Sequence, residues 1–215
     1  MKDHKSPSRV DIGKKETPFK GYFQIDRYHL RHQLFDGDMG PEIDREIFER
    51  GHAVSALLYD PDLDRLVFIE QFRMGAFAAK SSPWFGDDFN PWLTEIVAGI
   101  IEDGEHPDDV IRRETIEETG CVVKNLKQLF HYFASPGGTT ETVFCYVARV
   151  DASNAQGVHG IKQEGEDIRV FSVSVQQSFA MMDDGAFKNS MTLIPMQWFR
   201  NNHNKLRNEW LGLID

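Results

Sequence analysis

The sequence predicts an α/β fold, in which helices and a mixed β-sheet form a layered sandwich. Three observations lead to this prediction. The first half of the chain consists mainly of segments rich in β-branched and aromatic residues, which turn signals separate. One acidic helix then interrupts the strands, and two helices end the chain after further strands. Strands and helices in this order are typical of an α/β sandwich around a mixed sheet.

Length and composition set the outer limits of the prediction. A chain of 215 residues suits one sizeable domain, or one domain plus a small appendage, and 40% hydrophobic residues are enough for a real core. The formal net charge of −10 argues against nonspecific binding to nucleic acid or to an anionic membrane surface. No apolar run approaches the roughly 18 residues of a membrane-spanning helix.

The N-terminus and the cysteines favour a cytoplasmic protein. Residues 1–17 are polar, lack the apolar core of a signal peptide, and are predicted to form a flexible lead-in. Cys121 and Cys145 lie in apolar runs without metal-ligand spacing, so we expect two buried thiols rather than a metal site.

The first elements along the chain are predicted to be two hairpins and a loop. Residues 21–34 form a strand candidate, and the turn-like "DGDMG" leads to a second one over residues 41–51. Residues 52–60 and 65–72 flank the turn signal "PDLD". Residues 74–92 carry Gly, Pro and aromatic residues without a sustained period, which predicts a long exposed loop.

The second half of the chain is predicted to begin with a short strand over residues 92–99. A helix follows over residues 107–119, with Pro107 in its first turn and Gly120 at its C-terminal cap. The remaining predicted elements are strands near 122–133, 142–150 and 168–174, a polar loop over 153–167, and helices over 175–185 and 188–211, where Pro195 kinks or starts the last helix.

Three carboxylates crowd one face of the predicted acidic helix. Glu114, Glu117 and Glu118 stand at positions i, i+3 and i+4, so their side chains project within about 6 Å of each other. Like charges at this spacing repel and destabilise an isolated helix. The triplet alone leaves two interpretations open, a solvated acidic face and a cation site.

The surrounding residues decide between these interpretations. Gly99, Glu105, Arg113, the three glutamates and Gly120 form the pattern G-x5-E-x7-R-E-x2-E-E-x-G. This pattern resembles the signature of the Nudix hydrolases, which cleave nucleoside diphosphates linked to another group with the help of divalent cations. Thr115 and Cys121 stand where that family usually has aliphatic residues. The resemblance implies the Nudix α/β/α sandwich around a mixed sheet.

The resemblance also implies a metal site and a general base. Magnesium prefers hard oxygen ligands and shares them with substrate phosphates. Two or three Mg²⁺ ions per site are expected, with Mn²⁺ as an alternative. Arg113 is expected to pair with acidic neighbours such as Glu105 and so fix their side chains. The implied metal ligands are Glu114, Glu117, Glu118, Glu166 and the backbone carbonyl of Ala98, and the implied general base is Glu164 of the "EGED" segment.

A second motif narrows the substrate class. "SPGG", residues 135–138, resembles the marker of the ADP-ribose pyrophosphatase branch, and "REIFERGHA", "IEQFR", "GVHG" and "RNEW" extend the likeness to the bacterial enzymes of that branch. The implied reaction converts ADP-ribose to AMP and ribose 5-phosphate. Alternatives are a Nudix enzyme for another sugar nucleotide, such as GDP-mannose, and an ADP-ribose-binding sensor. The intact acidic pattern and the absence of a basic domain favour an enzyme.

The same likeness implies substrate contacts and a homodimer. An N-terminal β arm, residues 18–50, is expected to exchange between subunits, and residues 51–215 are expected to form the Nudix domain. Each active site would then borrow residues from the partner. The implied substrate-binding residues are Tyr22 and Phe23 near adenine, Arg45, Glu46 and Arg50 near the nucleoside and terminal ribose, Arg73 facing the diphosphate, and Ile100, Ser135, Gly137 and Glu141.

Overall fold

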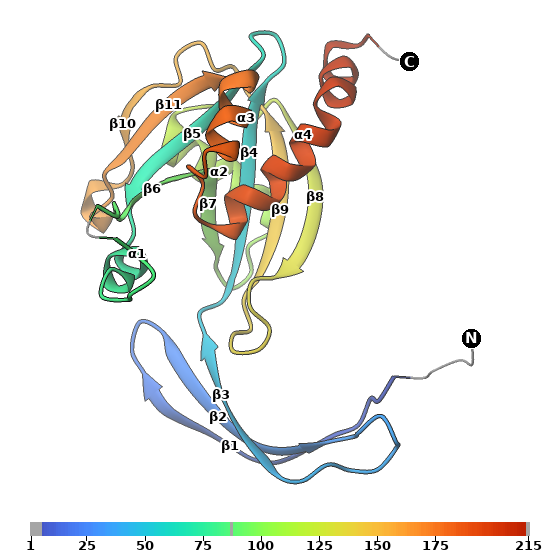
Figure 1. Ribbon diagram of the computed structural model, residues 1–215. Helices are drawn as coiled ribbons and strands as arrows, with labels where there is room; N and C mark the ends of the chain where they lie inside the picture. The colour runs from blue at the N-terminus through green and yellow to red at the C-terminus, as the bar shows by residue number, and fades with distance from the viewer. Residues whose placement is uncertain (1–5, 87, 214–215) are drawn as a thin grey trace. The chain divides into compact units, whose positions relative to one another are not determined.

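The computed structural model describes residues 6–86 and 88–213, apart from the side chain of Glu164. The chain divides into two compact units (Figure 1). One unit contains the residues up to His52 together with Phe133–Thr142, and the other contains Ala53–Tyr132 and the residues from Val143 onward. Each unit has its own sheet.

The first unit is built on a three-stranded antiparallel sheet in the order β1-β2-β3. Its strands are β1 (Val10–Lys20), β2 (Gln24–His32) and β3 (Ile43–Glu49). The predicted hairpin over residues 21–51 is confirmed by the pairing of β2 with β3.

The predicted flexible lead-in is wrong for residues 10–17, because these residues belong to β1. Ten of the eleven residues of β1 are exposed. The strand is held by its backbone pairing with β2 and not by a buried apolar face, so its sequence carries no alternating pattern. Residues 1–5 lie outside the described part of the chain.

The second unit is built on a mixed sheet, as predicted. Its main path runs β10-β11-β5-β4-β9-β8, with β6 paired to β5 and β7 paired to β4. The central strands β4 and β9 are parallel, whereas the pairs β4–β5 and β5–β11 are antiparallel. The strands are β4 (His52–Asp60), β5 (Arg65–Phe72), β6 (Trp92–Glu95), β7 (Val97–Ile101), β8 (Asn125–Phe133), β9 (Thr142–Arg149), β10 (Gly157–His159) and β11 (Ile168–Ser174).

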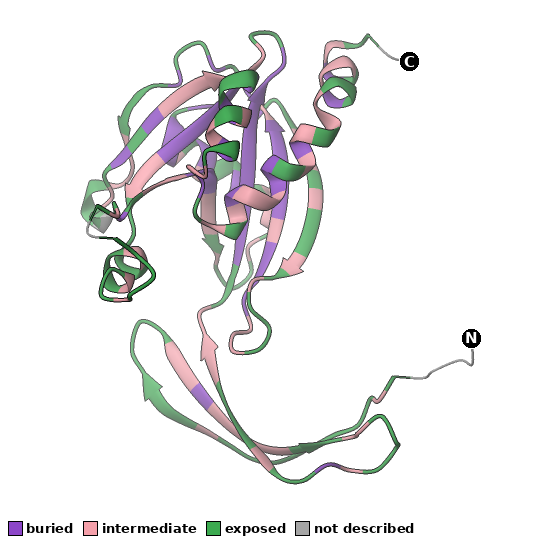
Figure 2. Ribbon diagram, viewed as in Figure 1, coloured by how far each residue is buried: buried purple, intermediate pink, exposed green. Residues whose placement is uncertain are grey.

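Helices cover both faces of this sheet. Helix α2 (Pro107–Thr119) packs on one face, and α3 (Val175–Asp183) and α4 (Ser190–Leu211) pack on the other (Figure 1). Alternate residues of β4 enter the two cores, with Ala56 on the α2 side and Leu57 on the α4 side. Figure 2 shows that burial is concentrated along the central strands. The predicted α/β/α sandwich is therefore confirmed.

Three expected segments differ from the prediction. The segment 74–92, predicted as a loop, begins with a short helix, α1 (Met74–Ala79), which has no buried residue. The single strand predicted over 92–99 is two strands, β6 and β7, because Ile96 leaves the ladder between them and enters the core under α4. The polar loop over 153–167 contains β10 and the 3-10 turn η1 (Lys162–Glu164).

The last helix and the cysteines follow the sequence more closely. Asn189 caps α4, and Pro195 lies inside the helix rather than at its start. Cys121 and Cys145 are buried free thiols, as predicted. No helix in the described part of the chain is long and apolar enough to cross a membrane.

Candidate active site

Helix α2 presents the crowded carboxylates on a fixed frame. It begins at Pro107, where the His106 side chain accepts a hydrogen bond from the Asp108 amide, and it ends at Gly120 in the left-handed conformation (φ 70°). The departure from the family pattern at Thr115 is accommodated, because its hydroxyl donates to the Ile111 carbonyl at 2.6 Å. The helix bounds match the sequence prediction because both end signals are local.

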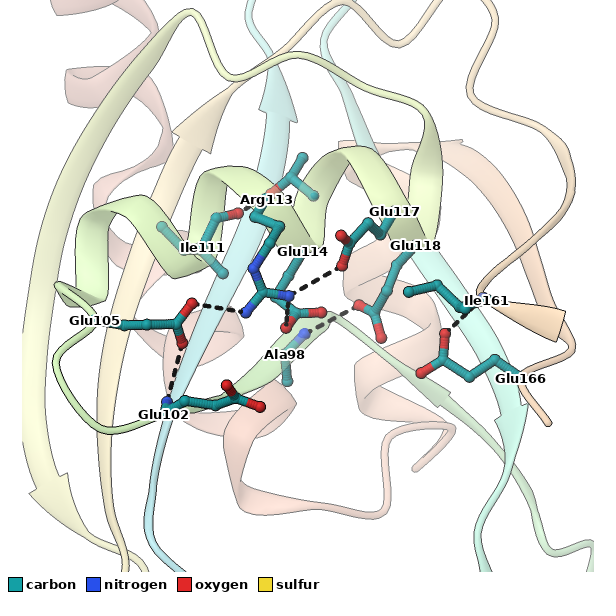
Figure 3. A network of polar contacts seen from close by, with 11 residues as sticks. Ala98, Glu102, Glu105, Ile111, Arg113, Glu114, Glu117, Glu118, Ile161 and Glu166 are labelled. Carbon is teal, nitrogen blue, oxygen red and sulfur yellow. Dashed lines mark hydrogen bonds and ion pairs between the residues drawn. The ribbon is translucent and has the colours of Figure 1, made fainter. Parts of the chain in front are cut away.

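Arg113 forms ion pairs with its acidic neighbours, as predicted (Figure 3). Its Nη1 lies 2.8 Å from Glu114 Oε1 and 3.0 Å from Glu117 Oε2. Its Nη2 lies 3.4 Å from Glu105 Oε1, and the other oxygen of Glu105 accepts the Glu102 amide at 2.9 Å. One guanidinium therefore restrains three carboxylates.

The strand β7 runs close beneath two of the glutamates. Glu118 is buried, and its Oε2 accepts a hydrogen bond from the Ala98 amide at 3.1 Å. Glu114 lies so close to Gly99 that a Cβ on residue 99 would overlap its side chain. The helix and the strand thus meet at Ala98 and Gly99, where the first glycine of the acidic pattern makes room for a carboxylate.

Burial makes ionisation of Glu114 and Glu118 unfavourable. Desolvation raises the pKa of Glu118 well above its usual range, against the hydrogen bond from Ala98, and the negative charges of Glu114 and Glu166 raise it further. Desolvation also raises the pKa of Glu114 to about 7; the charge and hydrogen bond of Arg113 oppose this shift, and the charges of Glu117 and Glu166 add to it. Both shifts reflect the cost of buried negative charge.

The donor set fits a divalent cation chemically. Within the described residues no three acidic, histidine or cysteine side chains converge into a closed metal site, and Arg113 binds Glu114 and Glu117 instead. However, Glu114, Glu117, Glu118 and Glu166 offer hard oxygens that repel each other. A bound cation would reduce the repulsion between these carboxylates and compensate for the desolvation that raises the pKa of Glu114 and Glu118.

The "EGED" segment is described only in part. Glu166 Oε2 accepts the Ile161 amide at 2.8 Å, which holds the carboxylate against the turn that begins there (Figure 3). The side chain of Glu164 lies outside the described residues, so its role as general base stays a prediction.

Arg73 lies directly after β5 and is bound by a residue that sequence reasoning missed. Its Nε and Nη2 lie 2.9 and 2.8 Å from Glu95 Oε2. The Arg73 charge also acts on Glu118, whose pKa it lowers. The sequence feature that could have pointed to Glu95 is its acidic side chain inside the mostly apolar segment "WLTEIVAG". Ile100, the other substrate candidate in this unit, is exposed on β7.

The remaining substrate candidates belong to the first unit. Tyr22 is 86% exposed and contacts Phe23 edge-on, and Phe23 packs on Phe48. Arg50 lies over the Phe23 ring at 5.9 Å, and its Nε is 3.4 Å from an oxygen of the buried Glu141. Aromatic faces beside a cation are suited to a nucleobase.

Arg45, Glu46 and the "SPGG" turn lie in the same unit. The Arg45 side chain donates to the Asp44 carbonyl, and Glu46 is paired with Arg27. In the turn, the Ser135 carbonyl accepts the amides of Gly138 and Thr139, so exposed Gly137 lies within a tight backbone turn.

Comparison with known proteins places these features in a family context. Residues 49–189 match the model of the NUDIX domain. The chain is 45% identical over 201 residues to the ADP-ribose pyrophosphatase of Escherichia coli (strain K12), covering 94% of this chain and 92% of that protein. It is 34% identical over 157 residues to the GDP-mannose pyrophosphatase of Enterobacter sp. (strain 638), covering 73% and 77%. A crystal structure of an ADP compounds hydrolase shares the fold, with a TM-score of 0.66 at 17% identity over 92% of this chain and 98% of that one.

Proposed function

This chain belongs to the Nudix family, where it groups with the bacterial ADP-ribose pyrophosphatases, and from this premise we propose that it hydrolyses ADP-ribose to AMP and ribose 5-phosphate. The observation that supports the proposal most strongly is the α2 platform, in which Glu114 and Glu118 are buried against Gly99 and Ala98. A helix that buries mutually repelling carboxylates is suited to an anionic substrate only when cations accompany it.

The proposed cation site uses the residues that the acidic pattern brings together. Mg²⁺, with Mn²⁺ as an alternative, would be held by Glu114, Glu117, Glu118, Glu166 and the Ala98 carbonyl, as two or three ions. When bound, such ions neutralise the diphosphate and lower the pKa of a coordinated water. Arg113 keeps Glu114 and Glu117 in place through its two contacts with them.

The proposed reaction is an attack of water on one phosphorus of the diphosphate. The water oxygen forms a bond to phosphorus, the bridging P–O bond breaks, and the water proton passes to Glu164. Arg73 binds diphosphate oxygens, because a guanidinium fork matches their geometry. Positioning and charge stabilisation dominate phosphoryl transfer, so these side chains are expected to affect turnover more than substrate affinity.

Most of the proposed substrate contacts lie in the first unit. Tyr22 and Phe23 offer faces to adenine, and their edge-on pair leaves the Tyr22 ring exposed. Charged side chains near the nucleoside and terminal ribose and backbone groups of the "SPGG" turn complete the set, which consists of Arg45, Glu46, Arg50, Ser135, Gly137 and Glu141, with Ile100 from β7. We infer a cytoplasmic homodimer in which the arm, residues 18–50, exchanges between subunits and residues 51–215 form the Nudix domain.

A substrate panel tests the proposal. The enzyme is assayed with Mg²⁺ on ADP-ribose, GDP-mannose and dinucleotides, and nucleoside monophosphate release is measured together with phosphate freed by a coupled phosphatase. We expect the highest kcat/KM with ADP-ribose. The likeness to a GDP-mannose pyrophosphatase makes GDP-mannose the main competitor. A higher kcat/KM on GDP-mannose would overturn the substrate assignment, and binding without turnover would favour a sensor.

A further inference from the structure

Glu95 at the end of β6 is a buried carboxylate with partners on both oxygens. Its side chain is only 7% exposed. Oε2 accepts hydrogen bonds from Arg73 Nε at 2.9 Å and more weakly from Gln71 Nε2 at 3.5 Å. Oε1 accepts from Asn189 Nδ2 at 2.7 Å. A buried charge that is this fully paired is held in one orientation, because losing any partner leaves part of it unsatisfied.

Asn189 connects this carboxylate to the start of α4. Its Oδ1 caps the helix by accepting the Thr192 amide at 2.8 Å, while its Nδ2 donates to Glu95. One side-chain amide therefore satisfies a free helix amide and a buried carboxylate at once. The position of Glu95 is thereby fixed from the N-terminal cap of α4, a helix of 22 residues.

Glu95 in turn fixes the orientation of Arg73. The backbone of Arg73 is set by its amide, which donates to the Pro91 carbonyl just beyond the β5–β6 ladder. Its side chain is 44% exposed, and the guanidinium uses its Nε and Nη2 edge for Glu95. The Nη1 donors are not used in this pair and are left for a ligand. A charge-assisted fork of this kind removes rotamer freedom that binding would otherwise cost.

We propose that Glu95 is a positioning residue that orients Arg73 for the diphosphate, and that Asn189 holds Glu95 in place from the cap of α4. This inference rests on the proposed function. It predicts a chain of dependence: Asn189 acts through Glu95, and Glu95 acts through Arg73. A carboxylate that only joined β6 to α4 would affect stability without any coupling to Arg73.

A double-mutant cycle separates these roles. Glu95→Gln, Arg73→Ala and the double variant are assayed for kcat/KM on ADP-ribose with Mg²⁺. Loss of a charge-assisted hydrogen bond corresponds to about tenfold or more, so we expect Glu95→Gln to lower kcat/KM by at least about tenfold. In the Arg73→Ala background the same change should have less than about a twofold effect. Equal effects in both backgrounds would overturn the proposal.

Asn189→Ser provides the second variant and Thr192→Val its control. Serine still caps α4 but removes the donor to Glu95, so we expect a lower kcat/KM that again depends on Arg73. Thr192 Oγ1 accepts the Ile96 amide at 3.3 Å, so valine breaks a different link between α4 and the residue that follows Glu95. Thr192→Val should lower the melting temperature without changing kcat/KM. If Thr192→Val and Asn189→Ser lower kcat/KM equally, the proposal fails. A wild-type protein without ADP-ribose turnover would instead refute the proposed function.

Discussion

Gly99 of β7 and Glu114 of α2 pack so closely that a Cβ on residue 99 would overlap the carboxyl end of Glu114. The glycine therefore determines where the carboxylate lies, since the backbone of β7 is held by its pairing with β4. The neighbouring Ala98 amide donates to Glu118 at 3.1 Å, so the positions of Glu114 and Glu118 depend on two adjacent residues of β7.

Gly99→Ala is expected to damage activity by displacing Glu114. A shift of a metal-binding side chain by about 1 Å lowers turnover by up to about a hundredfold. The kcat on ADP-ribose and the melting temperature of the variant give the comparison. Gly75→Ala is the matched control, because a Cβ there meets nothing within 4 Å. Wild-type kcat in Gly99→Ala would show that the close packing has no role in catalysis.

Glu118→Gln should separate metal binding from folding. The amide oxygen can still accept the Ala98 hydrogen bond, and glutamine lacks the ionisable group whose burial raises the pKa of Glu118, so the metal-free variant should be at least as stable as the wild type. Loss of a cation ligand should lower kcat by about a hundredfold or more. In EDTA-treated protein, adding Mg²⁺ should raise the wild-type melting temperature and raise that of the variant much less.

Asp109→Asn is the control for this experiment. Asp109 is an exposed carboxylate in the first turn of the same helix and lies outside the acidic pattern. We expect wild-type kcat and a normal response of its melting temperature to Mg²⁺. An equal Mg²⁺ response in wild type and Glu118→Gln would remove Glu118 from the proposed ligand set.

Asp64 is expected to stabilise the fold in a pH-dependent way. Burial opposes ionisation of Asp64, but hydrogen bonds from Tyr59 (2.7 Å) and His203 (2.6 Å) and the charge of Arg207 outweigh it, so its pKa is lowered from the usual 3.8. A lowered pKa gives stability that is present above pH 3.8 and is lost as pH falls through the folded-state pKa.

Asp64→Asn tests this expectation without straining the backbone. Residue 64 has a positive φ of 54°, which asparagine tolerates. Urea unfolding should show a loss of about 1 kcal/mol or more at neutral pH, and the difference from wild type should shrink below pH 3.8. Asp62→Asn changes a 60% exposed partner of Arg149 in the same turn and should have little effect. A difference that stays constant with pH would contradict the assignment.

Local signals explain how much of this architecture the sequence predicts. The bounds of α2 follow from Pro107 and Gly120. The pairing of Arg113 with Glu105, which lies before the helix, was expected from the resemblance to the Nudix family and not from helix spacing. β1 was missed because an exposed, paired strand has no apolar periodicity. Glu95 was missed because its partners, Arg73 and Asn189, lie 22 and 94 residues away along the chain. Long-range contacts between polar side chains leave no periodic trace in a single sequence.

The exchange of the arm between subunits can be tested by mixing two damaged proteins. One carries Glu118→Gln, and the other carries Arg45→Ala with Arg50→Gln in the arm. Arg45 donates only to the adjacent Asp44 carbonyl among its described hydrogen bonds, and glutamine at residue 50 keeps a donor for buried Glu141. Both changes should therefore leave the arm folded while weakening its contacts with the substrate.

Each protein alone should be nearly inactive at ADP-ribose concentrations below the wild-type KM. If each site combines the Nudix domain of one subunit with the arm of its partner, a mixed dimer has one site with both halves intact. Random reassortment makes half the dimers mixed, so co-refolded protein should recover about a quarter of wild-type activity. Light scattering checks that the mixed protein is dimeric. If each subunit used its own arm, every site in the mixed dimer would carry one defect and no activity would return.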